Sequence, residues 1–251
     1  SGICTNCARN YIEALQHLVG NRHEITTEKG EKKFKFSNSQ KISDDTIVLF
    51  WTKKPDEDID PFSDICQPTE ERVRDLFSSI ATGDHERVNT EVENYLYSCT
   101  ISSAAARIAV RDWMAISVSQ YQKNLKQWFD DIATIKDGEI YYPGINSILN
   151  NCIKAKSKPT QSDVKAKARI GAILWHAALT NAPLPLMILQ SVLTQIEHEK
   201  TTKYCKTFSS EKSTVIRLVL NRNIKKTYYM KKELDVQNES KAYLCGRLFA
   251  L

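Results

Sequence analysis

The stretch from residue 104 to residue 132 changes from a period of two to a helical period. In AAARIAVRDWM, the alternation predicts a strand. One face of this strand carries Arg107, Ala109, Arg111 and Trp113, and the other carries Ile108 and Val110. The two arginines, four residues and roughly 13 Å apart on one face, suit either phosphates of a nucleic-acid backbone or ordinary ion pairs at the rim of a sheet. From about Val118 to Ile132, apolar residues recur at helical spacing and predict an amphipathic helix.

The first half of the chain alternates predicted helices with predicted strands. Helical spacing predicts helices over 7–19 and 69–80. Runs of β-branched and aromatic residues, or alternation, predict strands over 33–36, 46–51 and 93–101. We expect the first two of these strands to pair, with the second one buried, and the third to pair with the arginine-bearing strand.

The second half of the chain is predicted to be helical. Residues 136–144 contain two glycines and a proline, which indicate a connection. Beyond it, helices are predicted over 145–153, 162–179 and 213–224, and over a segment that follows the break NAPLPLM and ends near residue 198. The sequence therefore predicts an α+β fold, with a small mixed or antiparallel sheet and packed helices in a domain over 1–135, and an all-helical domain over 136–251.

Composition limits the class of protein. The chain has 251 residues, of which 41% are hydrophobic, so it can bury one large core or two small ones. It has no run of about 18 apolar residues and no apolar segment of the kind that forms an export signal. We therefore expect a cytoplasmic protein that does not cross a membrane. The sequence begins with Ser1 and ends in an apolar stretch that reads as helix, so we expect a fragment of a longer protein.

Charge is segregated along the chain, although the formal net charge is only +5. Residues 55–93 hold twelve acidic and three basic residues. Residues 154–169 hold six basic residues and one acidic residue, and residues 200–232 hold ten and one. A single block of this kind usually marks a solvated face. Two basic blocks in one half of the chain favour a polyanionic partner such as a nucleic acid.

Six short segments, taken in order, resemble a known family. They are YIEALQHLV, DDTIVLFWTKK, AAARIAVRDWM, NAPLPLMILQSVL, TVIRLVLNR and AYLCGRLFAL. Together they resemble the Csd-type large subunit of the subtype I-C CRISPR Cascade complex. The resemblance covers most of the chain and corresponds to the middle portion of that subunit. The part that recognises the protospacer-adjacent motif and the C-terminal helical bundle are expected to lie outside it.

The resemblance implies a non-catalytic function in antiviral defence. Such a subunit lies at the crRNA 5′ end of an RNA-guided ribonucleoprotein, contacts target DNA and directs the displaced strand to a separate helicase-nuclease. The implied partners are crRNA, target DNA, the other Cascade subunits and the CRISPR helicase-nuclease, and no cofactor is implied. In such complexes, base pairing with the guide reads the sequence, while the protein contacts the backbone and a short motif.

Basic residues chosen by charge and predicted placement are the candidates for phosphate contact. They are Arg107, Arg111, Lys165, Lys167, Arg169, Arg217, Arg222, Lys225 and Lys226. Four aromatic residues, Tyr204, Phe208, Tyr228 and Tyr229, are interleaved with the last basic block. These rings either stack on unpaired bases or anchor loops onto the helical core.

No metal site or catalytic site is predicted. Cys4 and Cys7 form a CxxC motif, which is half of a zinc ribbon, and no second pair follows at ligand spacing. The acidic residues Asp56, Asp58, Asp60 and Asp64 are interpreted as a solvated loop rather than a magnesium site. No phosphate-binding or nucleophile motif is present. We therefore expect no enzyme, and two alternatives stay open: a protein-interaction domain without nucleic-acid binding, and a metal-dependent nuclease.

Overall fold

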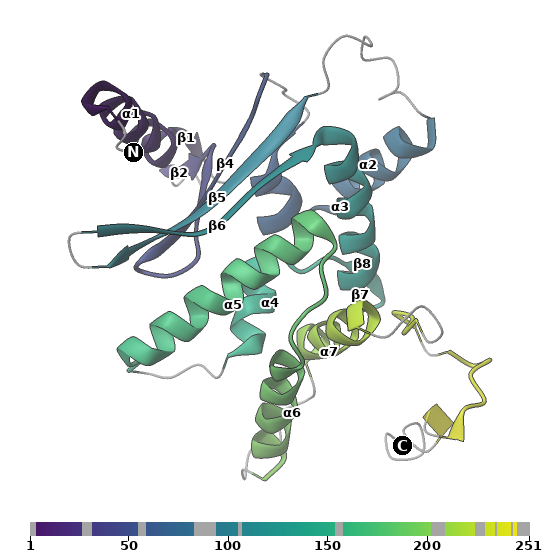
Figure 1. Ribbon diagram of the computed structural model, residues 1–251. Helices are drawn as coiled ribbons and strands as arrows, with labels where there is room; N and C mark the ends of the chain where they lie inside the picture. Colours follow the sequence, from purple (N-terminus) through teal and green to yellow (C-terminus); the bar gives the residue numbers. More distant parts are fainter. Residues whose placement is uncertain are drawn as a thin grey trace.

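The computed structural model in Figure 1 contains a four-stranded sheet with helices on both of its faces. It describes residues 4–26, 32–54, 59–82, 94–104, 107–153, 158–201, 209–223, 229–233, 235–241 and 243–244. The α+β fold predicted from the sequence is confirmed, because a four-stranded antiparallel sheet lies in the first half and most of the helices follow it.

The four-stranded sheet is antiparallel throughout, in the order β3-β4-β5-β6. Its strands are β3 (Ser39–Lys41), β4 (Thr46–Thr52), β5 (Tyr95–Ala104) and β6 (Arg107–Ser117). The predicted pairing of the 93–101 strand with the arginine-bearing strand is confirmed by the β5–β6 ladder.

The predicted pairing of 33–36 with 46–51 is wrong. β2 (Lys32–Phe36) pairs instead with β1 (Arg22–Thr26) in a separate two-stranded sheet. The short strand β3, which was not predicted, takes the place beside β4. Three residues are too few to show a period, so no local pattern indicated that β3 is the neighbour of β4.

A β-bulge interrupts the pairing of β5 with β6. Val110 lies opposite Ile101 and Asp112 lies opposite Thr100, so Arg111 is an extra residue on β6 without a partner. An extra residue of this kind shifts the alternation of side chains by one position along the rest of the strand. The strict period of two that was predicted across β6 therefore ends at Arg111.

The bulge separates Trp113 from Arg111. Arg111 and Asp112 both make their contacts on the face of the sheet that α5 covers. Trp113 lies on the opposite face, where its ring is 5.4 Å from the ring of Trp51 and 6.3 Å from that of Tyr97, measured between centroids. The prediction that Arg111 and Trp113 share a face is wrong for this reason.

The two faces of the sheet carry separate hydrophobic clusters. The face with Val48 and Phe50 belongs to the main core, which the helices complete. A small cluster, consisting of Leu49, Cys99 and Ile101, lies on the other face. This cluster is covered by α1 (Thr5–Gly20), the helix expected over 7–19.

The other described helices agree with the predicted ones within a few residues. They are α2 (Glu70–Thr82), α3 (Val118–Ile132), α4 (Ile145–Cys152), α5 (Gln161–Thr180), α6 (Leu186–Thr201) and α7 (Ser210–Asn223). A π-helical turn, η1 (Phe62–Cys66), was not predicted. Within the described ranges, none of the helices combines the length and the apolar composition that a bilayer crossing requires.

A short hairpin lies where the sequence indicated a connection. β7 (Thr134–Lys136) pairs with β8 (Glu139–Tyr141). In the turn between them, Asp137 has φ 54° and Gly138 has φ 88°. Two successive positive φ angles are typical of a type I′ turn, which favours Asp-Gly. The described elements that follow this hairpin are helices, as predicted, and the Asp-Gly pair was the signal for the hairpin.

Trp175 of α5 joins the helices to the sheet. Its ring is 0% exposed and stacks on Phe50 of β4, with 5.6 Å between the ring centroids. Its indole N–H donates a hydrogen bond of 2.9 Å to Oγ of Ser98 on β5. The main core includes residues from both sides of residue 135. The division into domains at that residue stays a prediction.

We expect Gly144→Ala to destabilise the protein. A Cβ atom at residue 144 would lie 2.0 Å from the backbone carbonyl oxygen of Cys66, so the backbone of η1 or α4 would have to move. Overpacking of this kind costs about 1–3 kcal/mol and would lower the midpoint of urea-induced unfolding. The matched control is Gly20→Ala, because a Cβ at residue 20 meets no atom within 4 Å. Equal midpoints for the two variants would contradict this packing.

Candidate nucleic-acid interface

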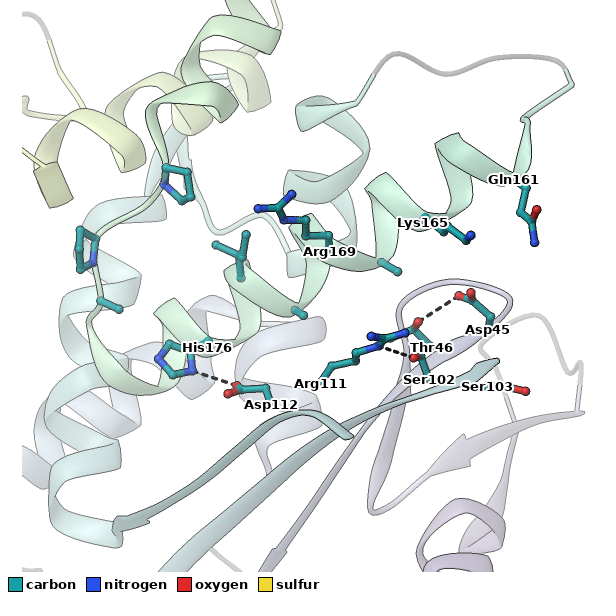
Figure 2. Close-up of a pocket in the computed structure, with 16 residues that line it drawn as sticks. Asp45, Thr46, Ser102, Ser103, Arg111, Asp112, Gln161, Lys165, Arg169 and His176 are labelled. Carbon is teal, nitrogen blue, oxygen red and sulfur yellow. Dashed lines mark hydrogen bonds and ion pairs between the residues drawn. The ribbon is translucent and has the colours of Figure 1, made fainter. Parts of the chain in front are cut away.

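A cleft of about 1140 Å³ lies between α5 and the part of the sheet where β4 begins and β5 ends. Figure 2 shows its two walls. The helical wall includes Lys165, Arg169 and His176. The sheet wall includes Arg111 and Asp112, the two residues that the bulge turns toward α5.

The sequence of α5 places its polar residues on the cleft side. Lys165, Arg169 and His176 are separated by four and seven residues, which aligns them along one side of a helix. Leu174 and Trp175, which project from other sides of the same helix, are 0% exposed. α5 thus attaches to the core through Leu174 and Trp175 and contributes Lys165 and Arg169 to the charge of the cleft.

Arg111 is held on the sheet wall by a neighbouring strand. Its Nε–H donates a hydrogen bond of 2.6 Å to Oγ of Ser102 on β5. The pKa of Asp45 is lowered, mainly by a hydrogen bond from the Ser43 hydroxyl. Thr46 and the charge of Arg111 make smaller contributions in the same direction. Asp45 is thus ionised at neutral pH and offsets part of the positive charge at this end of the cleft.

His176 and Asp112 connect the two walls of the cleft. Nδ1 of His176 lies 2.9 Å from Oδ2 of Asp112. With Asp112 paired in this way, no ion-pair partner of Lys165 or Arg169 is found in the part of the chain that the structure describes. Both of these side chains are exposed. The two positive charges lie about 6 Å apart along the helix axis.

A comparison with protein-family models identifies the family of the chain. The model described as CRISPR-associated protein (Cas_Csd1) matches residues 1–251. The chain belongs to this CRISPR-associated family. A search of curated proteins found no match. The CRISPR association predicted from the six short segments is therefore confirmed.

The cleft of this Csd1-family chain brings together three of the candidates for phosphate contact: Arg111, Lys165 and Arg169. Lys167 lies on α5, half-buried, and does not line the cleft. The structure places Arg107 at the start of β6 but does not describe its side chain. Outside the described residues lie Lys225, Lys226, Tyr204, Phe208 and Tyr228.

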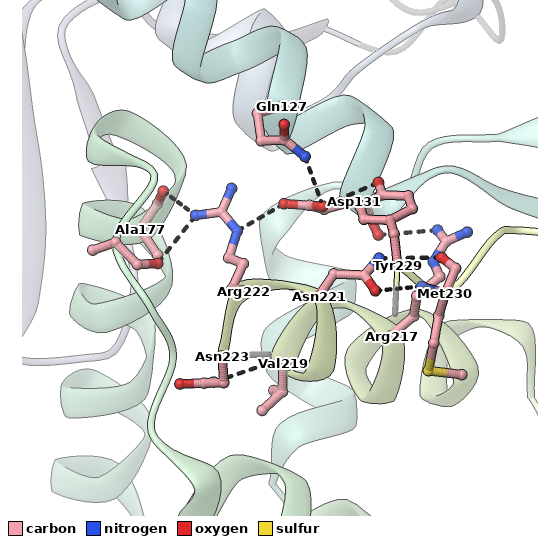
Figure 3. A network of polar contacts seen from close by, with 11 residues as sticks. Gln127, Asp131, Ala177, Arg217, Val219, Asn221, Arg222, Asn223, Tyr229 and Met230 are labelled. Carbon is pink, nitrogen blue, oxygen red and sulfur yellow. Dashed lines mark hydrogen bonds and ion pairs between the residues drawn. The ribbon is translucent and has the colours of Figure 1, made fainter. Parts of the chain in front are cut away.

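Arg217 and Arg222 are unavailable to phosphate, so their prediction as contact residues is wrong. Figure 3 shows both guanidinium groups among the polar contacts around Asp131. Nε of Arg222 lies 2.9 Å from Oδ2 of Asp131, and these side chains are 2% and 1% exposed. Arg217 donates to the backbone carbonyl oxygens of Asp131 and Ala133. α7 contacts α3, α4 and α6, so its polar side is buried as well as its apolar side.

Tyr229 belongs to the same network. Its hydroxyl donates a hydrogen bond of 3.2 Å to Oδ1 of Asp131. The pKa of Tyr229 is raised above its ordinary value, mainly by partial burial and secondly by the nearby Asp131 carboxylate. The hydroxyl of Tyr229 is thus anchored to the core while the residue stays 45% exposed, so stacking of its ring on a base stays a prediction.

No metal site is found at the described residues of the acidic segment 56–64. Within the described part of the chain, no group of three His, Cys, Asp or Glu residues could hold an ion. Asp64 was expected in a solvated loop, and that expectation is wrong. It is buried in η1, bonded to Arg72 and to the Tyr121 hydroxyl, which is 2.8 Å away. Burial raises the pKa of Asp64, although Arg72 opposes this shift.

Asp112 and His176 were not predicted as residues of the site. Asp112 reaches the cleft because of the bulge, for which a period-two pattern contains no signal. A signal for His176 was present. Thr160 and Asp163 form a capping box that fixes the start of α5. Counting from that start places His176 on the same side of the helix as Lys165.

We expect Arg222→Leu to destabilise the fold rather than to remove a phosphate contact. The substitution leaves the Asp131 carboxylate buried without its cation, which costs about 3–5 kcal/mol of unfolding free energy. Urea-induced unfolding measures this loss. The control is Arg169→Leu at an exposed position, where we expect a change within about 0.5 kcal/mol. A fully stable Arg222→Leu protein that has lost nucleic-acid binding would contradict the buried placement.

Proposed function

We propose that this chain is the middle portion of the non-catalytic large subunit of a subtype I-C Cascade complex, and that it contributes to target DNA binding in antiviral defence. Its partners would be crRNA, target DNA, the other Cascade subunits and the CRISPR helicase-nuclease, as the resemblance implies. The family match supports the association with CRISPR. The cleft beside α5 supports contact with a nucleic-acid backbone.

The observation that carries the proposal is the pair of exposed cations, Lys165 and Arg169, on the wall opposite Arg111. A cation that is not already paired can neutralise a phosphate and release its counterions, which favours binding. Paired surface charges would gain much less, because the protein would first have to give up the existing partner.

The lining of the cleft is also compatible with a nucleic-acid backbone, because its walls carry several charged and hydroxyl side chains. Polar side chains that contact phosphates fix the register of a nucleic acid without reading its sequence, as expected for a subunit of a guide-directed complex.

The geometry around His176 supports a non-catalytic role. A general base needs a nucleophile within about 2.6–3.2 Å. The hydroxyl of Ser102, which lies in the same cleft, accepts a hydrogen bond from Nε–H of Arg111. Within the described ranges, the side chain that contacts the His176 ring is the Asp112 carboxylate rather than a hydroxyl or a thiol. This pair is suited to connecting α5 to β6.

We expect the double variant Lys165→Gln, Arg169→Gln to bind DNA more weakly and with a smaller dependence on salt. The measurement is fluorescence anisotropy of labelled single-stranded and duplex DNA from low to physiological salt. Loss of two phosphate contacts should reduce the slope of log K against log salt by roughly 1.4–1.8. Its fold should be unchanged, because both side chains are exposed.

The matched control is Lys123→Gln, Lys232→Gln, which removes two exposed charges outside the cleft. This control should keep nearly the whole salt slope, since only the net charge changes. Equal losses in the two double variants would assign the binding to net charge and contradict the cleft. Absence of DNA binding by the unmodified chain would favour the protein-interaction alternative.

A further inference from the structure

The CxxC motif takes part neither in the cleft nor in the main core. Cys4 is the N-cap residue of α1, and Cys7 lies in the first turn of this helix. Both thiols are exposed. The other three cysteines that the structure describes, Cys66, Cys99 and Cys152, are buried. The sequence therefore places two neighbouring thiols on the surface and keeps these three away from solvent.

The two exposed thiols are in direct contact. Their Sγ atoms are 2.8 Å apart, and the backbone N–H of Cys7 donates a hydrogen bond of 3.2 Å to Sγ of Cys4. A disulfide has an S–S distance of about 2.05 Å and a C–S–S–C dihedral near ±90°, and it needs Cα atoms about 4.4–6.8 Å apart. Residues three apart in one helical turn lie within this Cα range, at about 5 Å, so rotation of the two side chains can bring the sulfur atoms of Cys4 and Cys7 together.

The environment distinguishes the two sulfur atoms. The side-chain hydrogen bond with Cys7, followed by the backbone hydrogen bond from the same residue, lowers the pKa of Cys4. The contact with Cys4 raises the pKa of Cys7. The positive end of the α1 dipole also favours a thiolate at the N-cap. Cys4 is thus the nucleophile of the pair and Cys7 the resolving thiol.

A zinc ion is the other ligand that a CxxC pair can hold. A structural zinc site needs four ligands, usually Cys and His. Within the described part of the chain, no third His, Cys, Asp or Glu joins these two thiols in a metal-binding group. The described residues therefore complete a dithiol but supply only half of a zinc site.

We propose that Cys4 and Cys7 form a redox-active dithiol whose co-reactants are low-molecular-weight disulfides. The Cys4 thiolate attacks one sulfur of the disulfide RSSR. A bond forms between Cys4 Sγ and that sulfur, the S–S bond of RSSR breaks, and the leaving RS⁻ takes up a proton. Cys7 then loses its proton and attacks Sγ of Cys4, expelling the second RS⁻. Two cysteine thiols lose two electrons and two protons, and RSSR is reduced to two RSH.

The test is thiol–disulfide exchange of the full chain with glutathione disulfide, followed by alkylation and site-resolved peptide mass spectrometry. We expect an intramolecular Cys4–Cys7 disulfide to form while Cys66, Cys99 and Cys152 stay reduced. In Cys7→Ser, the reaction should stop at a stable mixed disulfide on Cys4. In Cys4→Ser, the adduct on Cys7 should form more slowly, on the order of tenfold, because the favoured thiolate is missing.

Three outcomes would overturn the proposal. One is equal adduct rates in the two serine variants, which would show two independent surface thiols. Another is glutathione adducts on both cysteines without an intramolecular disulfide. The third is stoichiometric zinc in the purified chain, together with protection of both thiols from alkylation until a chelator is added. None of these outcomes depends on DNA binding, so the test is separate from that of the proposed function.

Discussion

The packing of α5 across the sheet is the contact on which the rest of this molecule depends. Trp175 inserts its ring against Phe50 and bonds to Ser98, so one side chain supplies both apolar burial and a satisfied polar group. Close approach is possible because residue 171 is glycine. A Cβ there would lie 2.2 Å from Cγ2 of Ile42. The same helix then presents its charged side to the ends of β4 and β5, which creates the cleft.

The charge of the cleft follows from how its neighbours are paired. The bulge in β6 turns Asp112 toward α5, where it meets His176. Without the extra residue, Asp112 would lie on the opposite face of the sheet, and His176 would lose this partner. Asp112 contacts His176, and no ion pair of Asp112 with Lys165 or Arg169 is found among the described residues. A single backbone irregularity thus connects the two walls.

The long periodic elements could be predicted from the sequence. α3 carries clear helical spacing, and the positions of Lys165 and Arg169 on one side of α5 follow from their four-residue separation. Periodicity also led to the error at Arg217 and Arg222, since a residue off the apolar stripe is normally exposed. Here α7 is enclosed by three helices, and Asp131 provides the buried partner. That partner lies far away in the sequence and is visible only after folding.

The strand errors have a different physical origin. Pairing partners in a sheet are chosen by side-chain packing over long sequence distances, whereas the local pattern indicates only that a strand exists. The pairing of β2 with β1 and the insertion of β3 beside β4 belong to this class. The bulge at Arg111 does too, because an extra residue leaves no trace in composition. The helical wall of the cleft could therefore be predicted from α5, whereas on the sheet wall Arg111 was predicted and Asp112 was not.

Hydrogen–deuterium exchange of the backbone amides, with and without single-stranded DNA at low salt, tests most directly whether the cleft holds nucleic acid. The account predicts slower exchange at saturating DNA in residues 161–173 of α5 and in residues 110–112 of β6. Exchange in α7 should stay the same, because its arginines are bonded inside the protein. Protection confined to α7, or unchanged exchange in α5 and β6 at saturating DNA, would contradict the account.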